Sequence, residues 1–102
     1  MAKSRYQIEM DFSRAIQQAD KLRALGENLY SLSNDKLNGT LQNISINWTG
    51  KNSQDFCTKG NILKDKMNGS AQELVNISED IRRVATVIYR AEMAALEIAG
   101  TE

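Results

Sequence analysis

The sequence predicts an all-α protein, a helix-turn-helix hairpin of two long antiparallel helices. Apolar residues recur every three or four positions on both sides of mid-chain, which is the period of an amphipathic helix. The 102 residues include no proline and only 6% are aromatic, so long helices are favoured over a sheet. Asn47-Trp48-Thr49-Gly50 is poor helix material near the centre of the chain. We therefore expect one domain over residues 1–102 that reverses at this tetrapeptide.

The first helix is expected over about residues 6–44. Its apolar stripe slips near Gly26 and again near Ser33-Asn34, so it is either straighter than a coiled-coil seam or locally interrupted. Asn38-Gly39 and Asn68-Gly69 are turn signals that could each split a helix. We expect both helices to stay whole, because the apolar period resumes in phase after Asn68-Gly69. The stripe of the first helix consists of Ile8, Phe12, Ala15, Ala19, Leu22, Leu25, Leu29, Leu32, Leu37, Leu41 and Ile44.

The turn is expected at about residues 45–51. Gly50 tolerates left-handed backbone angles and is costly inside a helix, which favours a reversal there. Trp48 is the only tryptophan, and it is a large apolar ring beside the bend. It can be buried by clamping over the junction of the two helices or by a partner.

The second helix, expected over about residues 52–99, carries the more regular stripe. Steps of four and three from Phe56 meet apolar residues at all but two positions, which makes a sustained a/d seam. Asn52 or Ser53 is placed to cap the N-terminus of this helix. We interpret the core or dimer seam as Leu63, Met67, Leu74, Ile77, Ile81, Val84 and Ile88.

Apolar residues cover a wider arc than one hairpin can bury. Two joined helices bury only the strip where they touch, whereas Leu25 with Leu29 and Val87 with Ile88 extend beyond one strip. Each such side chain gains ~1.5–3 kcal/mol when fully buried. A second hairpin would complete a four-helix bundle with coiled-coil-like packing. The expected partner is a second copy, giving a homodimer, or a related chain.

The composition argues against enzymatic chemistry. The chain contains no histidine, which excludes histidine-based acid–base catalysis and histidine-containing zinc sites. Cys57 is the only cysteine, and we interpret it as a half-buried structural thiol, with an intermolecular disulfide as the alternative. Thirteen basic residues balance thirteen acidic ones, so no overall field favours nucleic acid. We expect no catalytic site, no cofactor and no metal.

Membrane insertion and a standard leader are not expected either. No window approaches the ~20 apolar residues of a membrane span. The helix faces also lack the lysine and arginine bias of membrane-surface helices. Because the N-terminal residues lack the apolar core of a signal peptide, we expect that any export proceeds without a signal peptide.

The run from Trp48 to Phe56 resembles the W-x-G...F turn of the WXG superfamily, the small early-secreted-antigen-like substrates of type VII secretion. Trp48, Gly50 and Phe56 occupy the motif positions. The resemblance extends to the length, the leaderless start, the absence of proline, the two long helices and the central turn. It implies a hairpin that dimerises into a four-helix bundle and is exported through a membrane ATPase-driven machine. Members act as effectors, structural partners or carriers for a larger toxin.

A second family feature is displaced in this chain. Many exported members carry Tyr-x-x-x-Asp/Glu after the second helix, whereas Tyr89 is followed by Glu92 at three positions and by Met93 at four. Tyr89 and Glu92 are therefore either a displaced export signal or ordinary bundle residues. In the second case, a partner would have to supply the export signal.

Taken with the resemblance, the sequence predicts a non-enzymatic secreted substrate or partner protein of a type VII secretion system. The alternative comes from a different class of protein. It is a cytoplasmic helical adaptor or secretion chaperone that contains W-x-G and is not itself exported.

Overall fold

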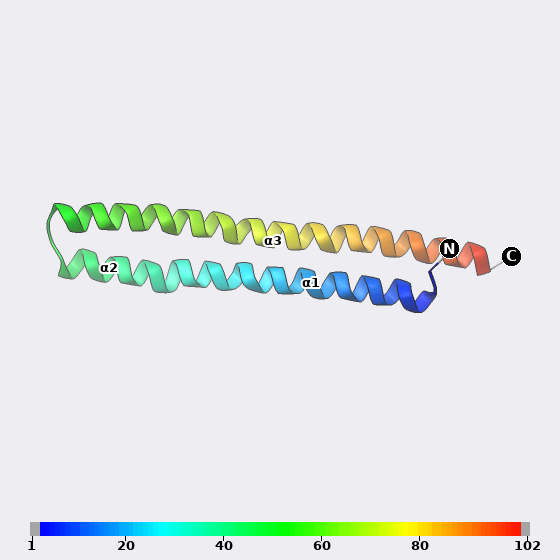
Figure 1. Cartoon of the computed structure of the whole chain (residues 1–102). Coiled ribbons are helices and arrows are strands. Elements are labelled where there is room, and N and C mark those ends of the chain that lie inside the picture. Colours follow the sequence, from blue (N-terminus) through cyan, green and yellow to red (C-terminus); the bar gives the residue numbers. More distant parts are fainter. Residues whose placement is uncertain (1–2, 101–102) are drawn as a thin grey trace. The chain divides into compact units, whose positions relative to one another are not determined.

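The computed structural model describes residues 3–100, and over that range its regular elements are all helices (Figure 1). They are α1 (Arg5–Ser31), the π-helical turn η1 (Leu32–Leu37), α2 (Asn38–Asn47) and α3 (Lys51–Gly100). The first three follow one another without a break, and the chain reverses between α2 and α3. The predicted fold class, an all-α helix-turn-helix hairpin, is thereby confirmed.

Contacts divide the chain into two compact units. The terminal unit combines the described residues of Met1–Arg23 with those of Asn76–Glu102, and the turn unit is Ala24–Val75. In the terminal unit, paired residues ascend along α1 while they descend along α3, so the two helical segments run antiparallel. These pairs are Phe12 with Tyr89, Asp20 with Arg82, and Arg23 with Glu79.

The reversal is shorter than the expected 45–51. α2 continues to Asn47, Trp48 is extended with φ −131° and ψ 117°, and α3 resumes at Lys51. Gly50 has φ +115°, a conformation that side chains disfavour, and its carbonyl oxygen accepts the first helical bond of α3. Neither Asn52 nor Ser53 is the N-cap expected from the sequence, because α3 already begins at Lys51. The Ser53 hydroxyl donates to the Gly50 carbonyl oxygen at 2.9 Å.

The first half of the chain is not one uniform α-helix. Over the expected range 6–44 the helix is interrupted by η1, where the backbone N–H of Asn38 reaches the carbonyl oxygen of Ser33, five residues earlier. The turn signals at Asn38-Gly39 and Asn68-Gly69 lie inside α2 and α3 and do not reverse the chain. The interruption therefore precedes Asn38-Gly39, at the second slip of the apolar stripe.

Small residues make the contact between the helices before the reversal (α1 and η1) and α3. On the first half, Ala19 and Ser33 have no exposed surface and Gly26 is buried, whereas Leu25 and Leu32 are 55% and 46% exposed. The contact side thus runs through Gly26 of α1 and Ser33 of η1, and the leucines beside them face away. The stripe that we read from large apolar residues is therefore displaced from the true contact by one residue at these two places.

The same displacement occurs on α3. Ala71 and Ser78 are 2% and 0% exposed, whereas Ile77, one residue before Ser78, is 47% exposed. One residue is a rotation of about 100° around a helix axis. Close approach of two helices favours small side chains, and the larger apolar residues are consequently left on neighbouring faces.

Candidate interaction surface

Part of the predicted seam forms an exposed apolar face of α3. Met67, Leu74 and Ile81 lie between the buried and exposed faces. The other four seam residues are about half exposed: Leu63 51%, Ile77 47%, Val84 51% and Ile88 50%. The seam is therefore divided, with one row bordering the intrachain contact and the other facing outward.

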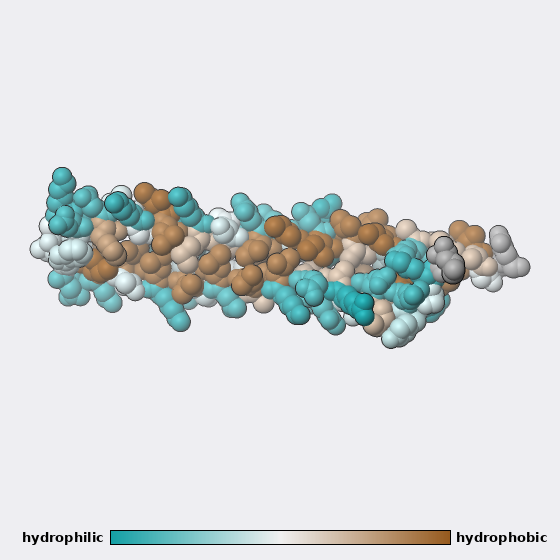
Figure 2. All heavy atoms as spheres, viewed as in Figure 1, coloured by the Kyte–Doolittle hydropathy of each residue, from teal (hydrophilic) through white to brown (hydrophobic). Residues whose placement is uncertain are grey.

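A shallow groove lies in the terminal unit on this face. It has a volume of about 370 Å³. Figure 2 shows apolar side chains gathered over α3 in this unit, with hydrophilic side chains beside them. The only charged lining residue is Asp80, which is engaged by Arg83 at 2.6 Å. The apolar lining consists of Ala15 from α1 with Ile77, Ile81, Val84, Ala85 and Ile88 from α3.

The turn carries a second exposed apolar group. Trp48 is 48% exposed and Phe56 50% exposed, and their ring centroids lie 6.4 Å apart. Ile46, at the end of α2, is 73% exposed. Trp48 therefore does not close over the helix junction as a buried clamp. It contacts Phe56 and leaves about half of its surface open, because the short reversal places the ring beside the two helix ends.

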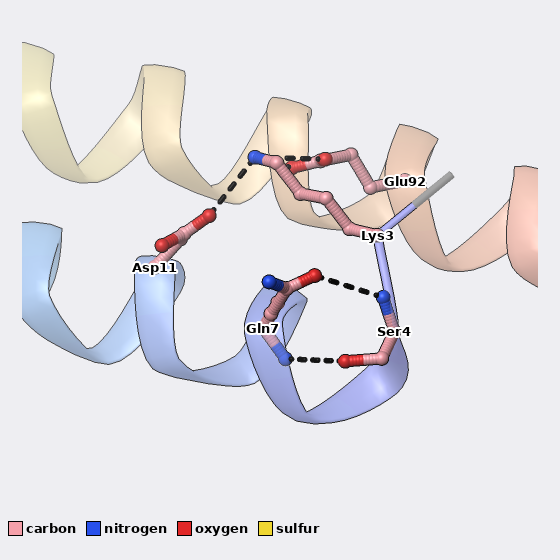
Figure 3. A network of polar contacts seen from close by, with 5 residues as sticks. All are labelled: Lys3, Ser4, Gln7, Asp11 and Glu92. Carbon is pink, nitrogen blue, oxygen red and sulfur yellow. Dashed lines mark hydrogen bonds and ion pairs between the residues drawn. The ribbon is translucent and has the colours of Figure 1, made fainter. Parts of the chain in front are cut away.

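The two candidate export residues are brought to one side of the terminal unit. Tyr89 packs on Phe12 with ring centroids 4.6 Å apart. Glu92 pairs with Lys3 at 3.1 Å, and the same ammonium group pairs with Asp11 at 2.9 Å (Figure 3). Hydrogen bonds to Asp11, which has the larger effect, and to Glu92 raise the pKa of Lys3 above its ordinary value. Both candidate residues are thus engaged by residues near the start of the chain.

A capping box positions Lys3. The backbone N–H of Gln7 donates to the Ser4 hydroxyl at 3.2 Å, and the backbone N–H of Ser4 donates to the Gln7 side-chain oxygen at 3.3 Å (Figure 3). This motif begins α1 at Arg5 and directs Lys3, the residue before Ser4, toward α3. The Ser-x-x-Gln spacing was available in the sequence, whereas the pairing of Lys3 with Glu92 depends on antiparallel register and was not predictable from spacing.

Cys57 lies near the reversal, on the contact side of α3. Its thiol is half-buried, and Sγ lies 3.7 Å from the carbonyl oxygen of Leu41. Among residues 3–100, no group of three or more histidine, cysteine, aspartate or glutamate side chains could hold a metal ion. Within the same range, no helix combines the length and apolar character needed to span a bilayer.

Comparison of the chain with family models, curated proteins and solved structures gave no match. The similarity of Trp48, Gly50 and Phe56 to the WXG motif therefore stays a prediction from the residues themselves.

Proposed function

We propose that the protein is a non-enzymatic secreted substrate, or a partner or carrier protein, of a type VII secretion system. It acts through a dimeric four-helix bundle, in which the outward apolar face of α3 packs on a second copy, on a related WXG-type chain or on a larger toxin. The membrane ATPase of the secretion machine is the further partner that the resemblance implies. The observation that carries the proposal is the row of half-exposed seam residues on α3, namely Leu63, Ile77, Val84 and Ile88.

The energy available on this face supports an association. Burial of a whole aliphatic side chain contributes ~1.5–3 kcal/mol, so the exposed half of each outward seam residue contributes about 1 kcal/mol. Leu63, Ile77, Val84 and Ile88 together represent on the order of 4 kcal/mol before the costs of association. Leu63, Ile77 and Val84 are separated by multiples of seven residues, and Ile88 follows four residues after Val84, which is the a/d spacing that suits the interdigitated packing of a bundle.

Association is tested with Val84→Glu. Val84 is half exposed and lines the groove, so the carboxylate can stay hydrated in the free hairpin but would be buried without a partner in the bundle. We expect sedimentation at micromolar concentration to show an assembled wild type and a helical but dissociated variant. Gln17→Glu places the same charge at an exposed position of α1 and should leave assembly unchanged.

A wild-type chain that stays monomeric alone and with candidate partners would contradict the bundle. Equal dissociation by Val84→Glu and Gln17→Glu would show that charge, and not this face, controls assembly. Arg82→Glu is a poorer control, because Arg82 pairs with Asp20 at 3.3 Å.

Export separates the leading function from the alternative. The same apolar face would serve a cytoplasmic adaptor or secretion chaperone that is retained in the cell. The chain is therefore expressed in a bacterium that has the secretion machine, with and without each candidate partner, and the culture medium is assayed. Accumulation in the medium that depends on the ATPase supports the secreted role. Retention under every combination, with an intact partner complex inside the cell, favours the adaptor or chaperone.

A further inference from the structure

The turn unit contains a π-helical turn beside a polar cluster, and neither is used by the proposed function. The polar cluster consists of Ser33, Asn34 and Asn38 at the two ends of η1 with Lys64 and Asn68 of α3. Ser33 has no exposed surface, although its position in the contact would suit an apolar side chain. A buried polar group at such a position lowers stability unless it is hydrogen-bonded, so its partners matter.

The repeat of contact positions explains why η1 exists. From Ile8 the contact side advances in alternating steps of four and three residues as far as Ser33. Continued steps of three and four would reach residue 40, whereas the buried residue is Leu41, at 4% exposure. On α3 the facing positions continue in regular steps through Cys57, Gly60 and Lys64. Between Ser33 and Leu41, the chain before the reversal therefore contains one residue more than regular steps of three and four would need to keep the contact side facing α3.

A π-helical turn accommodates one extra residue without breaking the helix. The bond from the Asn38 N–H to the Ser33 carbonyl oxygen spans five residues, which places the extra residue between them. Beyond η1 the helix returns to the register in which Leu41 packs over Gly60. A Cβ atom at Gly60 would meet the end of the Leu41 side chain, so the absence of a side chain at Gly60 leaves room for Leu41.

The polar cluster holds the extra residue at this position. The Asn68 side-chain oxygen accepts from the Ser33 hydroxyl at 2.7 Å and from the Asn34 amide at 2.9 Å. After η1, the Lys64 ammonium donates to the Asn38 side-chain oxygen at 3.1 Å. A slide of one residue would separate these groups and leave buried polar atoms without partners. Single polar residues in a helical seam are known to fix register in this way, at a cost in stability.

We propose that η1 and the polar cluster form a register lock. The turn stores one extra residue of the first half of the chain, and the cluster prevents that residue from moving along the helix. The lock thereby keeps Leu41 over Gly60 and fixes the position of the following reversal. This inference concerns the hairpin itself and does not depend on the proposed function.

Two single-residue deletions test the lock. Deletion of Asp35, which is exposed inside η1, restores alternating steps of four and three throughout the first half. Deletion of Gln18, which is exposed in the regular part of α1, breaks the steps and rotates the preceding residues by about 100°. We expect the chain without Asp35 to melt at or above the wild-type midpoint, and the chain without Gln18 to melt more than about 10 °C lower.

Amide hydrogen exchange supplies the second measurement. If the π-turn is replaced by an α-helix, the amides corresponding to residues 36–39 should exchange more slowly without Asp35 than in the wild type. The proposal would be overturned if deletion of Asp35 lowered the melting midpoint by more than half as much as deletion of Gln18 does. It would also be overturned if the protein tolerated both deletions equally. Unchanged exchange at residues 36–39 would overturn the placement of the extra residue in η1.

Discussion

Gly26→Ala tests whether close helix approach, and not large apolar side chains, holds the turn unit together. A Cβ atom at Gly26 would lie 2.9 Å from the Ala71 carbonyl oxygen, 3.1 Å from Val75 Cγ2 and 3.2 Å from Leu74 Cβ. The nearest of these atoms belongs to the backbone of α3 and cannot rotate away. Replacing a helical glycine by alanine gains about 1 kcal/mol of helix propensity. Overpacking costs about 1–3 kcal/mol, so we expect no net gain and a net loss of up to about 2 kcal/mol.

Gly69→Ala is the matched control. Gly69 also lies within a helix, but a Cβ atom there would meet no atom within 4 Å. Only the propensity gain applies, and we expect stabilisation by about 0.5–1 kcal/mol. Urea unfolding followed by circular dichroism at one fixed protein concentration measures both variants. If Gly26→Ala stabilises the protein as much as Gly69→Ala does, the helices do not approach closely at Gly26 and the reasoning is refuted.

Two further predictions concern the turn and the candidate export residues. Trp48→Ala should lower the free energy of unfolding by only about 1–2 kcal/mol, because half of the ring is exposed; a loss above about 3 kcal/mol in urea unfolding would indicate a buried clamp. Glu92→Ala should leave the melting midpoint within error, because its ion pair with Lys3 lies at the surface, where the Lys3 side chain is 45% exposed and solvent screens the pair. The same variant should still be secreted if a partner supplies the export signal, and secretion lost with the fold intact would show instead that Glu92 is part of the signal.

The general fold was predictable from the sequence, whereas the surface that makes the intrachain contact was not. Helical period and the absence of proline establish two helices, and Gly50 permits the reversal. Hydropathy gives most weight to large side chains, so it predicts a contact through residues such as Ile77, whereas the observed contact runs through Ser78. Ser33 carries no apolar signal at all. Its role becomes visible only when the spacing to Leu41 is compared with the observed contacts.

The candidate site was predictable to a similar extent. The motif contains Trp48 and Phe56, and their proximity follows from the short reversal, but their exposure depends on how the two helix ends meet. The engagement of Glu92 by Lys3 requires two distant segments in a defined antiparallel register. Periodicity along one helix contains no information about that register.

The division between small and large residues suggests why folding and association would be linked in this protein. Among the described residues, the buried apolar side chains are those of Ile8, Ala19, Leu41 and Ala71, and two of these are alanines. Such a contact brings helices close but removes little apolar area from water, and small domains depend on that area for stability. Several larger aliphatic side chains, among them Ile77, Val84 and Ile88, are instead about half exposed. Under the proposed function, the bundle would therefore supply much of the stability that the hairpin lacks, and the melting midpoint would rise with protein concentration.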